Sequence, residues 1–231
     1  MKRICLSWVA VVAVITIGCS RTERSKTDAS EQRPGGAAIG TGGVVVKSDE
    51  DFVHDVAIMN MTEIELSRMA LTKATSPDVR SFAQRMIDDH GAAGDKLKGV
   101  ISAYQMQWPS QLDDEHRKSV DELAKKQAGD FDREYAKAMV HGHQDLVAKL
   151  ESRLDVEALA NWKAAAAGRT QSKEMPDPKA ELRDVELRPE KSDRDRTAKI
   201  SQWAVDTYPV TQKHLDTART LEDATKKRST N

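Results

Sequence analysis

Residues 76–90 read Ser-Pro-Asp-Val-Arg-Ser-Phe-Ala-Gln-Arg-Met-Ile-Asp-Asp-His, and they carry the clearest structural signal in the chain. Ser76 is a favoured helix N-cap, and Pro77 suits the first helical position, where its missing N–H costs nothing. The apolar residues that follow recur at the spacing of one helix face. That face comprises Val79, Phe82, Ala83, Met86 and, on the same stripe, His90. The stretch therefore predicts an amphipathic helix with a titratable ring on its buried face, and we expect this helix to end at Trp108-Pro109.

Three other segments show the same periodicity, and they predict helices over residues 48–75, 129–168 and 200–221. No alternating strand pattern and no internal repeat accompanies them. Together the four segments predict an all-α fold, an up-down four-helix bundle that occupies residues 48–224. A charged stretch with three prolines, residues 169–194, forms a predicted insertion between the third and fourth helices.

Two features interrupt this pattern. The charged connector between the second and third segments contains a short helical pattern through Val120 and Leu123. Pro209 lies within the fourth segment, where it is expected to kink the helix and free the carbonyl of Val205.

Composition excludes several classes of protein. The 231 residues include 36 basic and 37 acidic side chains, so the chain lacks the basic excess of a nucleic-acid-binding protein and no nucleic-acid partner is expected. Only 4% of the residues are aromatic, which argues against a β-sandwich or barrel. The sequence does not indicate the oligomeric state.

The N-terminus has the features of an export signal. Lys2 and Arg3 precede an apolar run over residues 4–17, which is too short to span a membrane comfortably. The sequence Thr16-Ile-Gly-Cys19 resembles the lipobox of bacterial lipoproteins, in which the cysteine is lipidated after cleavage. Residues 1–18 are therefore predicted to be a signal peptide, with plain cleavage and an incidental Cys19 as the alternative.

Lipidation of Cys19 would attach the protein to a membrane. Ser20 follows the cysteine, and the usual sorting rule then places the lipoprotein in the outer membrane of the bacterial envelope. Residues 19–47 are rich in Ser, Thr, Gly and charge and are predicted to form a flexible tether. Cys5 and Cys19 are the only cysteines, so the remaining chain offers no thiol for a disulfide, a metal or catalysis.

Each predicted long helix carries one titratable residue on its apolar stripe: Glu63, His90, His143 and His214. Glu63 and His90 lie about 18 and 21 Å from the turn that joins their helices, at about 1.5 Å per residue, and His143 is also near mid-helix. One carboxylate and three imidazoles at mid-bundle would suit zinc, iron or copper. Asp89, next to His90, could orient a ligand.

A buried polar network is the alternative, in which the histidines bond to Glu63 and to one another without a metal. The sequence contains no phosphate-binding glycine loop, nucleophile elbow or H-E-x-x-H pair, which favours a non-catalytic protein. Two functions therefore stay open. One is a lipid-anchored bundle that binds, senses or scaffolds; the other is a metal- or cofactor-binding redox or stress protein.

The chain also resembles an exported bacterial family of unknown function whose members are often labelled outer membrane proteins. The resemblance extends over residues 51–221 and implies a ferritin-like bundle. Its recurrent polar core residues correspond to the same four positions, Glu63, His90, His143 and His214. It rests on Asn60-Met-Thr-Glu-Ile-Glu-Leu66, Phe82-Ala-Gln-Arg-Met-Ile-Asp-Asp-His90, Gly129-Asp-Phe-Asp-Arg-Glu-Tyr135, His143, Tyr208-Pro209 and His214.

The sequence departs from that family and from di-iron proteins. Tyr208 stands where the family usually has Leu, and residues 155–194 are longer than its usual connection. Di-iron members of the ferritin-like fold use Glu-x-x-His on two helices. Here Ile87, Val140 and Thr211 stand three residues before the histidines, so ferroxidase activity does not carry over.

Overall fold

The computed structural model describes residues 48–169, 187–192 and 194–228, and within them the chain is helical and forms no strand. This confirms the all-α prediction. The helices in these ranges are α1 (Asp49–Lys73), α2 (Pro77–Ser102), α3 (Asp114–Ala124), α4 (Ala128–Glu151), α5 (Val156–Arg169) and α7 (Asp195–Arg228).

Some predictions fall outside the described residues. The signal peptide, Cys19 and the tether lie within residues 1–47, and most of the insertion lies within residues 170–186. None of the helices in the described part is both long enough and apolar enough to cross a membrane.

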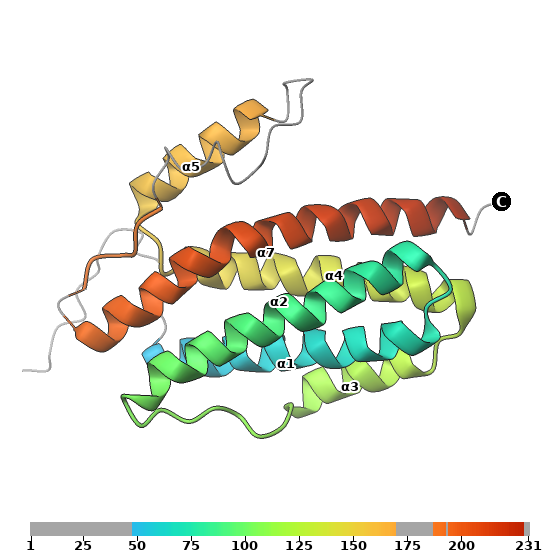
Figure 1. Ribbon diagram of the computed structural model, residues 1–231, viewed down its shortest axis with the longest axis horizontal. Coiled ribbons are helices and arrows are strands. Elements are labelled where there is room, and N and C mark those ends of the chain that lie inside the picture. Colours follow the sequence, from blue (N-terminus) through green and yellow to red (C-terminus); the bar gives the residue numbers. More distant parts are fainter. Residues whose placement is uncertain (1–47, 170–186, 193, 229–231) are drawn as a thin grey trace, which may run out of the picture. The chain divides into compact units, whose positions relative to one another are not determined.

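Each of the four long helices packs against two of the others, so that their contacts close a ring. α1 packs against α2 and α4, and α7 packs against the same two helices (Figure 1). α3 lies outside this ring, against α1 and α4. α7 continues through Pro209 as one helix to Arg228. The inward stripes of these helices therefore face a common interior.

The turn between α1 and α2 is held by a residue of α4. Buried Asp132 accepts hydrogen bonds from the backbone N–H groups of Thr75 and Ser76, at 3.0 and 2.8 Å, and from the Thr75 hydroxyl. α2 begins at Pro77 as predicted, but a carboxylate from another helix satisfies N–H groups at this helix start. This contact fixes α4 beside the α1–α2 hairpin.

The predicted end of the second helix at Trp108-Pro109 is wrong, because α2 ends at Ser102. Gln105 adopts a left-handed conformation with φ of 56°, and the N–H groups of Gln105 and Met106 bond back to the carbonyls of Ser102 and Ile101. These two bonds form a Schellman motif. Glycine or asparagine usually marks such an ending, and the sequence has neither at position 105.

The prediction of one continuous helix over residues 129–168 is also wrong. α4 ends at Glu151 and α5 begins at Val156. Asp155 caps α5 by accepting the Ala158 N–H at 2.9 Å, and its own N–H bonds to the carbonyl of Arg188. The break leaves Arg153 between the helices, and there it turns inward.

Arg153 belongs to a buried ionic network at the start of α1. Its side chain is 1% exposed, donates to Asp49 Oδ1 at 2.7 Å and lies over the ring of Phe52. Asp49 Oδ2 accepts from Thr197 and Arg196 of α7. Burial raises the pKa of Asp49, but these three donors outweigh it, and the pKa lies below its usual value. The network joins α1, α7 and the α4–α5 turn.

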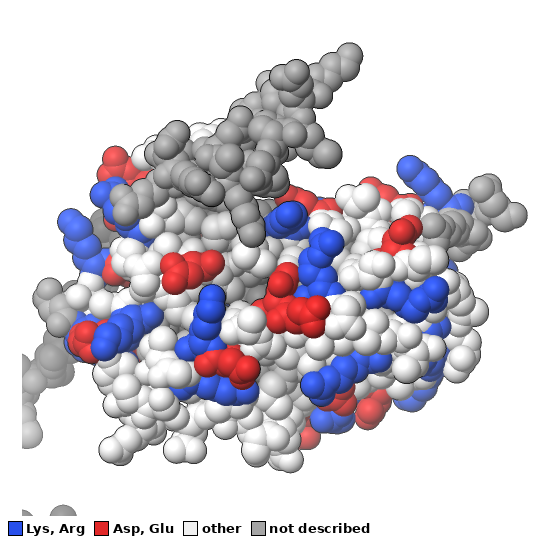
Figure 2. All heavy atoms as spheres, viewed as in Figure 1, with Lys and Arg blue, Asp and Glu red and all other residues white. Residues whose placement is uncertain are grey.

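Charged side chains on the surface are mixed in sign. On the face drawn in Figure 2, Lys and Arg lie interspersed with Asp and Glu. Several are paired across helices, such as Lys149 with Asp55 at 2.7 Å and Arg117 with Glu65 at 2.5 Å. Exposed pairs such as that of Arg117 and Glu65 contribute little stability individually.

Replacing Arg153 with alanine is expected to lower the free energy of unfolding by about 3–5 kcal/mol, because it breaks a buried ion pair and leaves Asp49 with Arg196 and Thr197 alone. Urea denaturation of the variant measures this. Arg219→Ala, which removes an exposed pair with Asp216, serves as the control and should cost less than about 1 kcal/mol. Equal losses of unfolding free energy in the two variants would mean that the buried pair of Arg153 with Asp49 stabilises the protein no more than an exposed pair does.

Candidate metal centre

The four titratable residues predicted on the helix stripes lie together in the interior. Glu63 comes from α1, His90 from α2, His143 from α4 and His214 from α7, and all are 5% exposed or less. His90 Nε2 lies 3.0 Å from Glu63 Oε2, and His143 Nδ1 lies 3.1 Å from Glu63 Oε1. The carboxylate therefore joins α1 to two of the three histidine-bearing helices.

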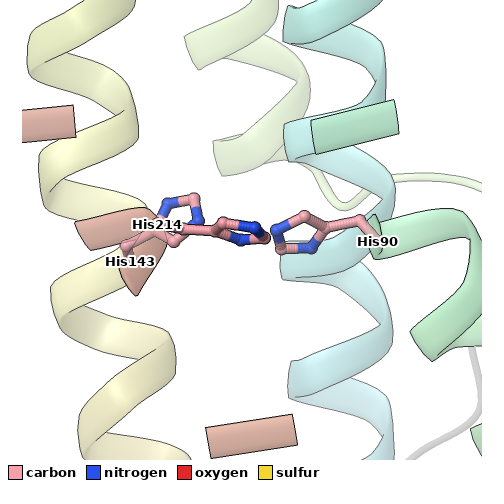
Figure 3. A group of neighbouring side chains, drawn as sticks. All are labelled: His90, His143 and His214. Atoms are coloured by element: carbon pink, nitrogen blue, oxygen red, sulfur yellow. The ribbon is translucent and has the colours of Figure 1, made fainter. Parts of the chain in front are cut away.

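The three imidazoles form a compact group, which we call the histidine centre (His90, His143 and His214). Figure 3 shows the three rings pointing toward one another from separate helices. Their centroids are 5.4–5.6 Å apart, and one possible ligand nitrogen from each lies within 4.8 Å of the others. Three nitrogen donors at this spacing can converge on a single ion.

This polar layer lies between two hydrophobic clusters. On α4, Met139 belongs to the cluster near the α1–α2 turn and Leu146 to the cluster near the start of α1, with His143 between them. On α2, Met86 and Leu97 flank His90 in the same way. The ring of Phe82 lies 6.4 Å from the rings of both His143 and His214. Along the helix axes, the centre is thus surrounded mainly by apolar side chains.

Each of two histidines is fixed through one nitrogen and has the other unpartnered. His143 Nδ1 donates to the Met139 carbonyl at 2.9 Å, and His214 Nε2 donates to Asp89 Oδ2 at 2.8 Å. His143 Nε2 and His214 Nδ1 are buried without a hydrogen-bond partner among the described residues. A carbonyl or carboxylate on one ring nitrogen is the usual arrangement of a metal-binding histidine.

Electrostatics favour an ionised Glu63 and a neutral His214. Burial raises the pKa of Glu63, but His143 and His90 outweigh it and hold the pKa well below its usual range. Burial, with the neighbouring His90 and His143, lowers the pKa of His214 to about 4, against the opposing effect of Asp89. Burial lowers the pKa of His143, but Glu63 and the Met139 carbonyl raise it overall, so a proton competes for His143.

A pocket of about 180 Å³ reaches the centre from the surface between α2 and α7. His90 and His214 line it, whereas His143 is fully buried and does not. Asp89 and Lys96 also contribute to the wall. The pocket gives small molecules a route to two of the three rings.

The structure shows supporting contacts of the centre that the sequence did not indicate. Asp89, expected to orient a ligand beside His90, contacts His214 on the neighbouring helix α7 instead. Asn60 donates to the His90 carbonyl at 2.7 Å and ties α1 to α2. Gly142 makes room for Glu63, because a Cβ at this position would lie 2.7 Å from Glu63 Oε1. A glycine next to a core histidine in mid-helix was the available signal for this close approach.

The other histidines lie away from the centre. His141 is 79% exposed and His54 is 59% exposed. His116 pairs with Asp113 at the start of α3.

Imidazole donors suit zinc, iron and copper, so the histidine centre is chemically able to hold such an ion. Whether it does so stays a prediction.

Gly142→Ala is expected to destabilise the protein, because the new methyl group would displace the buried Glu63 carboxylate. The matched control is Gly91→Ala on α2, where a Cβ would meet nothing within 4 Å. Alanine should there raise the free energy of unfolding by up to about 1 kcal/mol through its better helix propensity. Urea denaturation of both variants checks this. Equal stabilisation by the two substitutions would mean that Gly142 does not support the centre.

Comparison with known proteins gives one match. The profile of the family described as Domain of unknown function (DUF4142) matches residues 37–175. The match includes Glu63, His90 and His143, whereas His214 lies beyond it. No curated protein and no solved structure is significantly similar to the chain. Because the match spans more than half of the 231 residues, the chain belongs to the DUF4142 family, a family of unknown function.

Proposed function

We propose that this protein is an envelope lipoprotein whose core binds one first-row transition-metal ion on His90, His143 and His214. The observation that carries the metal proposal is the state of the ring nitrogens. His143 Nε2 and His214 Nδ1 are buried and unpartnered, while the opposite nitrogen of each ring is held by an oxygen acceptor. A metal ion would use the two free lone pairs.

The scaffold of the proposal is a ferritin-like four-helix bundle made of α1, α2, α4 and α7. Its support is the closed ring of helix contacts and the inward position of one polar residue from each helix. The ligand set differs from that of di-iron bundles, because the residues three before the histidines are Ile87, Val140 and Thr211. The proposed centre therefore holds one ion.

The ring nitrogens are too far apart to bind a metal ion without some movement of the rings. Ligand nitrogens around a tetrahedral zinc ion lie about 3.3 Å apart, given metal–nitrogen bonds of about 2.0–2.1 Å. The nitrogens of the histidine centre lie within 4.8 Å of one another, so the rings must move inward by about 1 Å. Glu63 would balance part of the ion's charge and orient His143 through Nδ1.

The second candidate is a metal-free bundle that senses or scaffolds without catalysis. The observation that favours it is the position of Glu63, which lies 3.0 and 3.1 Å from two imidazoles and forms a polar network without any ion. Such a network can specify how helices pair while contributing little net stability.

Metal content distinguishes the two candidates. The purified full chain, incubated with zinc, iron(II) or copper(II) and then dialysed, is expected to retain about one ion per chain by mass spectrometry. His143→Ala and His214→Ala should lose it, because each removes a donor nitrogen. His141→Ala is the matched control on the same helix as His143 and should retain the ion. A metal-free wild type with an unchanged melting temperature in all three metals would refute the metal proposal.

The membrane proposal rests on the N-terminal sequence. Lys2 and Arg3, the apolar run over residues 4–17 and Thr16-Ile-Gly-Cys19 together support lipidation of Cys19 and sorting to the outer membrane.

Cys19→Ser is expected to abolish incorporation of labelled palmitate and to release the protein from the membrane fraction, because serine cannot be the acceptor of a lipoprotein diacylglyceryl group. Cys5→Ser is the matched control and should be labelled and fractionate as the wild type does. If the Cys19→Ser protein still fractionates with membranes, the lipid is not the anchor.

A further inference from the structure

The geometry points to a metal centre with one coordination position open to the pocket between α2 and α7, where a small anion or water binds the ion. This inference rests on the metal binding proposed above. It adds a ligand site and a ligand class: monodentate, small and able to donate a lone pair to the metal. A closed structural metal would have four protein ligands, whereas sites that act on exogenous ligands have three.

The number of protein donors supports the open position. The group of possible ligand atoms within 4.8 Å of one another comprises three histidines. Glu63 is not in that group: its oxygens lie 3.0 Å from His90 Nε2 and 3.1 Å from His143 Nδ1, and His143 Nδ1 also donates to the Met139 carbonyl. A carboxylate in that place orients a ligand. Three imidazoles then leave the fourth tetrahedral position of the ion without a protein donor.

The surroundings of the centre determine where that position faces. Phe82 lies against His143 and His214, and the apolar cluster that contains it closes that side. His143 is 0% exposed, which closes the α4 side. The pocket contacts the centre at His90 and His214. An exogenous ligand therefore has its route between α2 and α7.

The pocket wall suits a small polar ligand. Thr211 lines the pocket one helical turn before His214, and its hydroxyl donates to the Thr207 carbonyl at 3.1 Å. Because the Thr211 hydroxyl proton is used in this hydrogen bond, the Thr211 oxygen can accept a hydrogen bond from a water molecule bound to the metal. Lys96 adds a positive charge to the wall, whereas Asp206 and Asp89 add negative ones, and Asp89 is paired with His214. The volume of about 180 Å³ admits several waters or a small anion and excludes a macromolecule.

Azide binding to the copper(II)-loaded full chain tests the inference. Azide is a small monodentate anion, and its coordination to copper(II) produces a charge-transfer absorption band. The band is expected to appear and to saturate at one azide per bound copper. Copper content is measured on the same samples by mass spectrometry.

A matched pair of variants tests whether azide reaches the copper through the pocket between α2 and α7. Val210 lines the pocket and is 43% exposed, whereas Val156 on α5 is 83% exposed and does not line it. Val210→Trp should fill the pocket and weaken azide binding by about tenfold or more, with copper retained. Val156→Trp should bind azide as the wild type does. If Val210→Trp does not fold, Ala92→Trp at the same pocket replaces it.

The outcomes separate this inference from the proposal on which it depends. A protein that binds no copper refutes the metal centre and the open position together. A protein that binds copper but produces no azide band keeps the metal centre and overturns the open position. Equal azide affinity in the wild type and in the folded pocket variant overturns the α2–α7 route.

Discussion

The buried carboxylate of Glu63 is the constraint on which the rest of the interior depends. A charge that is taken out of water must be compensated by nearby partners or it destabilises the fold by several kcal/mol. Here the compensation comes from His90 on α2 and His143 on α4, and space for the carboxylate comes from Gly142. The helices must therefore meet at one height along their axes, and that height also brings His214 to the other two rings.

The same constraint divides the core. Apolar side chains gather on either side of the polar layer, and the two hydrophobic clusters do not share a residue. Sliding one helix along another by a turn would place an imidazole against Met or Leu side chains and leave Glu63 without partners. The polar layer thus specifies the pairing of the helices, whether or not an ion is bound.

Much of this fold could be predicted from the sequence, because helix periodicity and the Ser76-Pro77 start are local signals. Counting residues from the turn also brought Glu63 and His90 to the same level. The helix ends were harder to predict. α2 stops at a Schellman motif with Gln105 in place of glycine, and α4 stops where Arg153 turns in toward Asp49. Both depend on partners far away in the sequence, as does the contact of Asp89 with His214.

The network around Asp49 has a mechanical consequence. A force applied to the chain before α1 acts first on Ser48, whose carbonyl accepts a hydrogen bond from Arg153. The next residue, Asp49, passes the load to the α4–α5 turn through Arg153 and to α7 through Arg196 and Thr197. Tension applied at Ser48 would thus be shared from the first turn of α1 by three parts of the described structure, namely α1, α7 and the α4–α5 turn.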